Sequence, residues 1–280
     1  MKKITRRSFL AAAGLTAAAL ALTACGGSSS STASSVASSA AASSEAASSS
    51  VAAAELTTVE AGKLTMATNA AFPPYEMTTD AGDFEGIDIE TAQAIADKLG
   101  LELQIDDMDF DAALLSVQQG KADIVMAGVT VTDERKAVMD FSDSYATGIQ
   151  SIIVPEGSDI ASPDDLAGKK IGTQRGTTGY IYCSDDFGDE NVVAYDDGLT
   201  AVQALNNGQV DAVVIDNAPA KEFIAANPGL VILETSYAEE DYAIGLAKGS
   251  SLEDAINSAL EELKADGTLQ SIVDKYISAE

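Results

Sequence analysis

Two side chains of opposite charge, Arg135 and Asp216, are the first candidates for chemistry in this 280-residue chain. Arg135 ends the run of residues 132–135, in which Thr132 stands where a helix N-cap is expected. A cation in the first helical turn opposes the helix dipole, but an anionic ligand there reverses the effect, because it takes the guanidinium and the free N–H groups together. The sequence leaves open whether Arg135 binds an anion or is a surface arginine offset by Asp133 and Glu134.

Asp216 follows a predicted buried strand, residues 210–215, and precedes Asn217-Ala218-Pro219. A carboxylate at the carboxyl end of a strand that faces a cleft can hold an ammonium group. The same residues also suit an Asx turn or a helix cap, and the sequence leaves both interpretations open.

Three aromatic residues, Phe72, Tyr75 and Phe110, lie in otherwise polar loops. They are candidates for the walls of a small-molecule pocket, although ordinary packing of a loop against the core is the more common reason for each of them taken separately.

The composition excludes several classes of function. The chain has no histidine, which excludes imidazole metal sites and histidine-based catalytic triads. It has 44 acidic against 16 basic side chains, a formal net charge of −28, which argues against nucleic-acid binding. Two cysteines cannot form a disulfide scaffold, and we expect Cys183 to pack as a small hydrophobic residue. We expect no cofactor and no metal.

The N-terminal segment has the features of an export signal. Positive residues are followed by an apolar stretch, residues 10–22, that is too short to span a bilayer stably. The end of the stretch resembles a bacterial lipobox, in which Cys25 becomes the lipid-bearing first residue of the mature chain. We expect a signal peptide at 1–24 and, at 25–61, the lipidated cysteine with a Ser/Ala-rich flexible tether. Arg6 and Arg7 leave twin-arginine and ordinary export open.

The rest of the chain predicts an α/β fold. We expect strands at 63–68, 101–105, 122–126 and 210–215, with a further strand after residues 168–172. We expect helices at 89–99, 112–119 and 199–207, then two amphipathic helices, the first opened by a capping box of Ser250 and Glu253. The segments 119–125 and 207–213 share one pattern, a helix end, a glycine, and an aspartate before an apolar strand. Ligands of such folds bind beyond the carboxyl ends of the strands, near residues 69–75, 127–135, 174–178 and 216.

Four runs in the correct order give a specific resemblance. They are residues 86–90, residues 127–135 followed by Asp140-Phe141-Ser142, residues 69–76, and residues 210–213 with Asp216. The chain from about Gly62 onward is similar to the solute-binding proteins of polar amino-acid ABC importers, the bacterial extracellular solute-binding proteins of family 3. Thr91 departs from the usual aliphatic residue after the first run.

The resemblance implies a two-lobed, periplasmic-binding-protein-like α/β fold with a hinge of two crossover segments, near residues 145–150 and 239–243. Lobe 1 is then discontinuous, residues 62–146 plus 242–280, and lobe 2 comprises residues 147–241.

It also implies roles for the candidate residues. Arg135 holds the ligand's α-carboxylate with help from Thr130, and Asp216 holds the α-ammonium opposite the Gly128 carbonyl. The side chain of the ligand lies between two aromatic rings, and polar residues read its far end. The expected site is Asn69, Phe72, Tyr75, Phe110, Ala127, Gly128, Thr130, Arg135, Gln174, Thr177 and Asp216.

The resemblance further implies a monomeric binding protein that is not an enzyme. It is anchored by lipid to the outer face of the cell membrane and delivers a free amino acid to an ABC permease. Relatives that bind basic amino acids often have a carboxylate at the position of Asn69, so its amide favours a neutral polar, glutamine-like ligand. A basic amino acid or cystine is the alternative ligand. A small dehydratase that uses Glu76 or Asp88 as acid or base, and a tethered sensor or adhesin module, are alternative functions.

Overall fold

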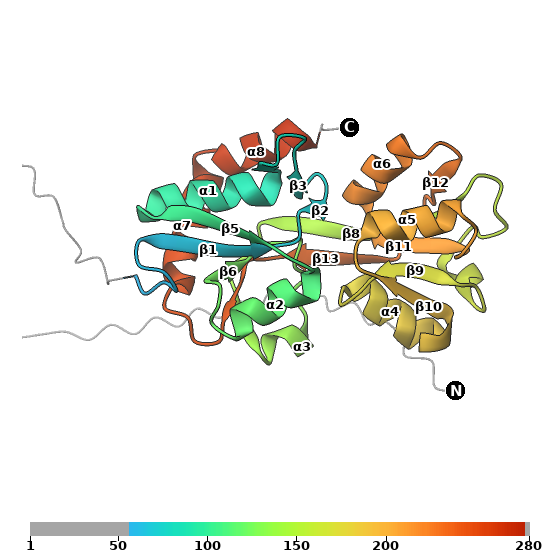
Figure 1. Ribbon diagram of the computed structural model, residues 1–280, viewed down its shortest axis with the longest axis horizontal. Helices are drawn as coiled ribbons and strands as arrows, with labels where there is room; N and C mark the ends of the chain where they lie inside the picture. The colour runs from blue at the N-terminus through green and yellow to red at the C-terminus, as the bar shows by residue number, and fades with distance from the viewer. Residues whose placement is uncertain (1–55, 278–280) are drawn as a thin grey trace, which may run out of the picture. The chain divides into compact units, whose positions relative to one another are not determined.

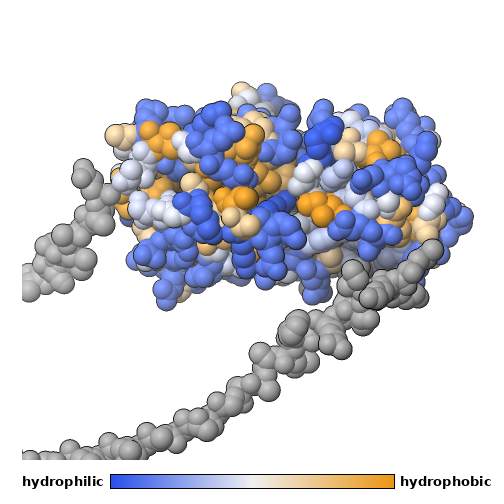
Figure 2. All heavy atoms as spheres, turned by 90° about the horizontal axis from the view of Figure 1, so that it is seen from below, coloured by the Kyte–Doolittle hydropathy of each residue, from blue (hydrophilic) through white to orange (hydrophobic). Residues whose placement is uncertain are grey.

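The computed structural model describes residues 56–277. The predicted signal peptide, Cys25 and nearly all of the predicted tether lie outside the described residues. Within the described part, no helix combines the length and the apolar character needed to cross a membrane. The described residues form two lobes, each built on its own β-sheet with helices on both faces (Figure 1). Hydrophilic side chains cover most of the face seen in Figure 2, with hydrophobic residues in patches between them.

The first lobe contains a five-stranded sheet in the order β5-β1-β6-β14-β7. Its strands are β5 (Glu102–Asp107), β1 (Lys63–Thr68), β6 (Ile124–Val125), β14 (Gly245–Ala247) and β7 (Met139–Phe141). Strand β1 pairs in parallel with β5 and β6, and β14 runs antiparallel to both its neighbours. A small sheet, β2 (Ala71–Phe72), β3 (Glu76–Thr78) and β4 (Phe84–Glu85), adjoins it.

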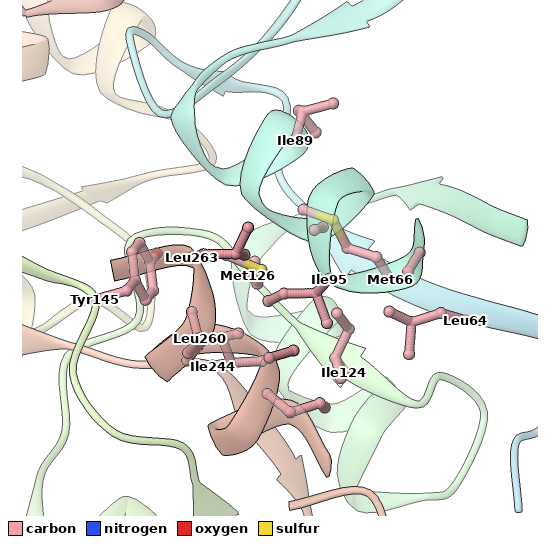
Figure 3. Close-up of a cluster of buried hydrophobic side chains, with 14 of the residues drawn as sticks. Leu64, Met66, Ile89, Ile95, Ile124, Met126, Tyr145, Ile244, Leu260 and Leu263 are labelled. Carbon is pink, nitrogen blue, oxygen red and sulfur yellow. The ribbon is translucent and has the colours of Figure 1, made fainter. Parts of the chain in front are cut away.

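Alternation along the strands decides which helices cover which face of this sheet. Leu64 and Met66 pack on one face against the helices α1 (Ile87–Leu99), α7 (Glu253–Ala265) and α8 (Thr268–Tyr276) (Figure 3). Ala67, next along β1, lies on the other face in a cluster with α2 (Phe110–Gln118). The sheet is therefore buried between two apolar layers, as its apolar strands predict.

The second lobe contains the sheet β10-β9-β11-β8-β12, with β13 also paired to β8. Its strands are β10 (Val192–Tyr195), β9 (Ile171–Gln174), β11 (Ala212–Asp216), β8 (Ala146–Pro155), β12 (Leu230–Ile232) and β13 (Ala238–Tyr242). The helices α5 (Gly198–Asn206) and α6 (Asn217–Ala226) pack on one face of this sheet, and α4 (Thr178–Phe187) packs on the other. Cys183 of α4 is fully buried, as expected for a small hydrophobic residue, and burial raises the pKa of its thiol to about 12.

The repeated pattern in the two lobes corresponds to one structural joint. Asp123 accepts the N–H of Thr65 at 2.8 Å and donates its own N–H to the Thr65 carbonyl at 2.9 Å. Asp211 makes the same pair of bonds with Lys170, each at 2.8 Å. Each aspartate therefore ties the start of its own strand to the start of the neighbouring parallel strand.

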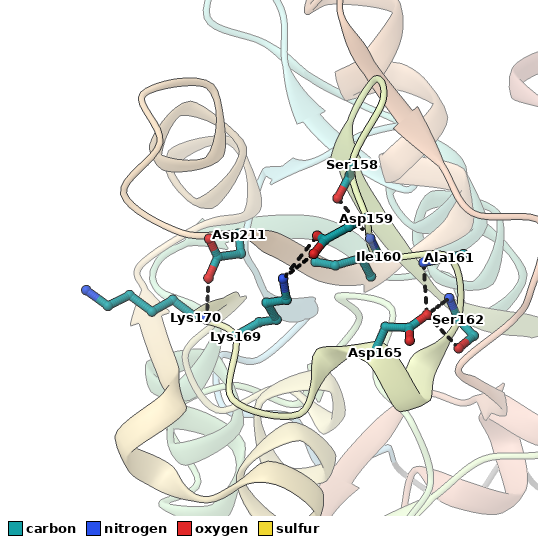
Figure 4. A network of polar contacts seen from close by, with 9 residues as sticks. All are labelled: Ser158, Asp159, Ile160, Ala161, Ser162, Asp165, Lys169, Lys170 and Asp211. Carbon is teal, nitrogen blue, oxygen red and sulfur yellow. Dashed lines mark hydrogen bonds and ion pairs between the residues drawn. The ribbon is translucent and has the colours of Figure 1, made fainter.

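Figure 4 shows the polar contacts around the second of these joints, between Asp211 and Lys170. A short 3₁₀ helix, η1 (Pro163–Leu166), lies between β8 and β9, and Asp165 accepts hydrogen bonds from the backbone of Ala161 and Ser162. Lys169 pairs with Asp159 at 3.0 Å. These exposed contacts fix the loop that leads the chain into β9.

The chain passes between the lobes twice, from β7 to β8 and from β13 back to β14. Strands β8 and β13 pair antiparallel along the crossing, from Ala146 opposite Tyr242 to Gln150 opposite Ala238. The two crossover segments are thus hydrogen-bonded to each other. A side chain cannot be accommodated at Gly148 in this pair, because an added Cβ would lie 2.5 Å from the Tyr242 ring.

We therefore expect Gly148→Ala to destabilise the protein by about 1–3 kcal/mol, the usual cost of overpacking a buried site. The Tm should fall by several degrees in thermal denaturation. Thr147→Ala, at the exposed neighbouring position of β8, is the matched control and should leave the Tm nearly unchanged. A Gly148→Ala protein as stable as the wild type would show that Tyr242 is not held as described.

One predicted helix start is wrong. Helix α7 begins at Glu253 with Leu252 as its N-cap, and no side chain caps it. The Ser250 hydroxyl accepts the N–H of Leu252 at 3.2 Å, so it stabilises the turn before the helix and not the helix itself. Ser250 and Glu253 therefore do not form the predicted capping box.

Candidate ligand-binding site

A cavity lies between the two lobes, and side chains of both lobes line it. It is lined by every residue of the predicted site except Tyr75. These residues are Asn69, Phe72, Phe110, Ala127, Gly128, Thr130, Arg135, Gln174, Thr177 and Asp216. The fold therefore brings together residues from four predicted strand ends.

Tyr75 lies behind the cavity wall and not in it. Its side chain is buried, and its ring stacks on Phe72 with centroids 5.8 Å apart and meets Tyr242 edge-on at 5.5 Å. Tyr75 therefore supports the aromatic wall, which differs from the expectation that it reads the polar end of a ligand. The spacing of residues in an irregular loop does not show which of its aromatic side chains lines a cavity and which lies behind the wall.

Arg135 is a buried cation held by the backbone of both lobes. Thr132 is the N-cap of the four-residue helix α3 (Asp133–Lys136), as predicted, and its hydroxyl accepts the Arg135 N–H at 3.1 Å. The guanidinium donates to the Thr130 carbonyl at 2.7 Å and to the Gly176 carbonyl at 3.1 Å. Its burial overturns the alternative of a surface arginine.

An aromatic ring and an acid influence the buried guanidinium of Arg135. Its guanidinium carbon lies 5.4 Å from the centre of the Phe110 ring. Burial lowers the pKa of Arg135, and the Glu240 carboxylate is the strongest influence that opposes this. A guanidinium has five N–H donors, so the two backbone bonds leave donors for a carboxylate.

Asp216 both caps a helix and faces the cavity. It ends β11 and accepts the N–H of Ala218 at 3.0 Å as the N-cap of α6. Its other oxygen accepts the Ile149 N–H at 2.8 Å and the Tyr242 hydroxyl at 2.9 Å. Asp216 is therefore a helix cap, and it also lines the cavity, as a role in ligand binding requires. Burial raises the pKa of Asp216 to about 6, although these three donors oppose the rise.

Two amides meet across the cleft at another part of the cavity. Gln174 donates from Nε2 to Asn69 Oδ1 at 2.8 Å and to the Asp196 carbonyl at 3.2 Å. Asn69 in turn donates to the Met108 carbonyl at 2.9 Å. The amide pair offers both donor and acceptor character without net charge.

A hydrogen bond to the Asp88 carboxylate fixes the turn at Gly128. Asp88 Oδ2 accepts the Gly128 N–H at 3.0 Å and the Tyr145 hydroxyl at 2.8 Å. Gly128 has φ +55°, and a Cβ there would lie 2.9 Å from the Phe72 ring, so glycine is required. Burial raises the pKa of Asp88 to about 6, and it raises the pKa of the neighbouring Glu76 well above its ordinary value.

Several lining residues were missed by the sequence analysis as ligand contacts. They are Glu76, Gln150, Thr178, Val214, Ile215 and Tyr242. Gln150 carries a readable signal, because it is a polar side chain at the start of the apolar run of β8. Tyr242 does not, because it reaches the cavity only through the pairing of β13 with β8.

Comparison with known proteins agrees with this architecture. The L-cystine-binding protein TcyJ of Escherichia coli K12 is 33% identical over 226 residues, 79% of this chain and 85% of that protein. The arginine-, lysine-, histidine-binding protein ArtJ from Geobacillus stearothermophilus is 34% identical, with a TM-score of 0.75 over 78% of this chain and 96% of that chain. An ancestral arginine-binding protein, solved bound to glutamine and bound to arginine, is 42% identical, with a TM-score of 0.74 over 78% of this chain and 99% of that chain.

The model of one protein family matches residues 64–279, which include both lobes and the cavity. The family is one of transport proteins and not of enzymes, which overturns the dehydratase alternative for Glu76 and Asp88. The chain belongs to the bacterial extracellular solute-binding proteins, family 3.

Proposed function

We propose that the protein captures a free amino acid between its lobes and delivers it to an ABC permease. The observation that carries this proposal is the pair of buried, oppositely charged side chains, Arg135 and Asp216, that line one cavity. A zwitterion needs one cation and one anion at a fixed separation, both shielded from water. Charge-assisted hydrogen bonds contribute about 1.5–3 kcal/mol each, and micromolar affinity needs about −8 kcal/mol in total. Two such contacts and an aromatic sandwich supply most of it.

In this proposal Arg135 and Thr130 bind the α-carboxylate, and Asp216 and the Gly128 carbonyl bind the α-ammonium. Phe72 and Phe110 enclose the side chain, while other residues of the predicted site border its polar end. Lobe 1 comprises residues 62–146 plus 242–280, and lobe 2 residues 147–241. Rotation of the lobes about the β8–β13 pair closes the cavity, and the closed form is the one that the permease reads.

The favoured ligand is a neutral polar, glutamine-like amino acid. The support is the uncharged pair of Asn69 and Gln174, which can bond to an amide but cannot neutralise a guanidinium. The alternative is a basic amino acid or cystine, because the similar proteins include binders of arginine and of cystine. The ancestral relative was solved with both glutamine and arginine, so one such site can accept both kinds of ligand.

The proposed location rests on the sequence of the N-terminal segment. We propose that Cys25 carries lipid and that the tether holds a monomeric binding domain at the outer face of the cell membrane, beside the permease.

A thermal-shift screen tests the amino-acid assignment. The chain without its predicted signal peptide and Cys25, residues 26–280, is unfolded and refolded to remove ligand, then heated with each standard amino acid, ornithine, citrulline or cystine. A ligand at 100 times its Kd stabilises the fold by about 2.7 kcal/mol, which raises the Tm by several degrees. A shift with one or a few amino acids is expected. No shift with any of them would reject the proposed function.

A further inference from the structure

Glu240 is a buried acid on the strand that carries the chain back to the first lobe. Its neighbours on β13, Glu239 and Asp241, are exposed, whereas Glu240 is only 6% exposed. Strand alternation turns this one side chain of the three toward the interior. A buried carboxylate is costly unless it is bonded, so its partners indicate its role.

All three hydrogen bonds to Glu240 come from side chains that line the cavity. Its Oε2 accepts from the hydroxyl of Thr178 at 3.0 Å, from Gln150 Nε2 at 3.0 Å and from the hydroxyl of Thr130 at 3.1 Å. Its Oε1 is buried and makes no hydrogen bond to any described residue. The carboxylate also influences Tyr182, whose pKa is raised to about 12 mainly by burial and further by Glu240.

The hydroxyl protons of Thr130 and Thr178 are therefore used in the hydrogen bonds to Glu240. Each hydroxyl has a single proton, and an ionised carboxylate can only accept. The two hydroxyl oxygens lie 3.4 Å apart, so a bond between them is longer and weaker than the charge-assisted bonds to Glu240. While these bonds persist, neither hydroxyl has a proton to donate to a carboxylate beside Arg135. A hydroxyl bond from Thr130 to the ligand must therefore replace its bond to Glu240.

Glu240 also acts on Arg135 directly. Its charge is the strongest influence that offsets the effect of burial on the pKa of Arg135. The two side chains are also linked through Thr130, whose hydroxyl donates to Glu240 and whose carbonyl accepts from Arg135. A ligand carboxylate that approaches Arg135 therefore comes under the influence of a like charge, in surroundings where screening by water is weak.

We propose that Glu240 sets the affinity of the site, as an internal carboxylate that competes with the ligand's carboxylate for the donors around Arg135. The inference rests on the proposed function, in which Arg135 binds that carboxylate. Glu240 then lowers affinity for every α-amino acid and makes release to a permease faster.

The test compares Glu240→Gln with Glu239→Gln in the chain 26–280, by calorimetric titration of an amino acid that shifts the wild-type Tm. Glutamine keeps the size and one acceptor oxygen of Glu240 but removes its charge. We expect Glu240→Gln to lower the Kd at least tenfold and Glu239→Gln to leave it unchanged, because the charge of Glu239 is exposed and screened. The gain should be absent for the α-carboxamide of the same amino acid, measured by displacement, because this probe has no carboxylate.

Glu240→Asp is a second variant, in case Glu240→Gln does not fold. It keeps the negative charge but moves the carboxylate one methylene farther from Thr130, Thr178 and Gln150. It should tighten binding to a smaller degree. If wild type and Glu239→Gln bind equally and neither Glu240 variant binds more tightly, the inference is overturned while the proposed function stands. If no form binds any amino acid, the proposed function and this inference both fail.

Discussion

Replacing Arg135 by alanine is expected to raise the Kd of the bound amino acid at least about a hundredfold. The change removes the cation that lines the cavity, and with it the two proposed charge-assisted bonds to the ligand, of about 1.5–3 kcal/mol each. It also removes the bond from Arg135 to the Gly176 carbonyl, which joins the two lobes. Calorimetric titration of the wild type and the variant measures the loss, and circular dichroism checks that the variant is folded.

Arg175→Ala is the matched control for this experiment. Arg175 is the other arginine of the described residues, and it is exposed and pairs with Asp196 at 3.4 Å. An exposed ion pair contributes little, so the control should bind as the wild type does. Equal losses in the two variants would contradict the role of Arg135, because they would indicate a general effect of positive charge.

Lowering the pH through 6 is expected to weaken binding through Asp216. Burial raises the pKa of Asp216 to about 6, and only its ionised form can hold an ammonium group. A carboxyl group with this pKa is about nine-tenths protonated at pH 5, so the Kd should rise about tenfold for each pH unit below 6. Titrations at pH 7.5, 6 and 5 measure the slope.

Asp216→Asn separates this effect from other titrating groups. The variant should bind at least about a hundredfold more weakly at pH 7.5, and its remaining affinity should change little down to pH 5. Asp88 has a pKa of similar height and supports the Gly128 N–H. The same tenfold slope in Asp216→Asn would assign the pH dependence to Asp88 and contradict the assignment to Asp216.

The parts of the fold that depend on local patterns were predictable from the sequence. Thr132 caps α3 because a threonine at that position can accept the backbone N–H three residues on. The helix predicted at 199–207 is α5, and the strand predicted at 210–215 is β11, each displaced by one or two residues. The similar patterns around Asp123 and Asp211 correspond to the same joint in both lobes.

The parts that depend on distant pairings were not predictable from such patterns. Tyr242 reaches Asp216 because β13 and β11 both pair with β8, and no short-range pattern records this. Glu240 reads as one acid among several in residues 239–241, and only the strand pairing buries it. Tyr75 lies behind the cavity wall, against Phe72, and the sequence cannot show which aromatic residue of a loop lies in front of the other.

The position of β14 in the first sheet has a consequence for the synthesis of the chain. Strand β14 lies between β6 and β7, so this sheet is incomplete until residue 247 has been made, whereas all strands of the second sheet lie in one continuous stretch. A growing chain can therefore complete the second lobe first, while β6 and β7 keep unpaired edges that other chains can join. Chains that stop short of β14 expose these edges permanently, which makes them recognisable to the proteases and chaperones that remove unfinished proteins.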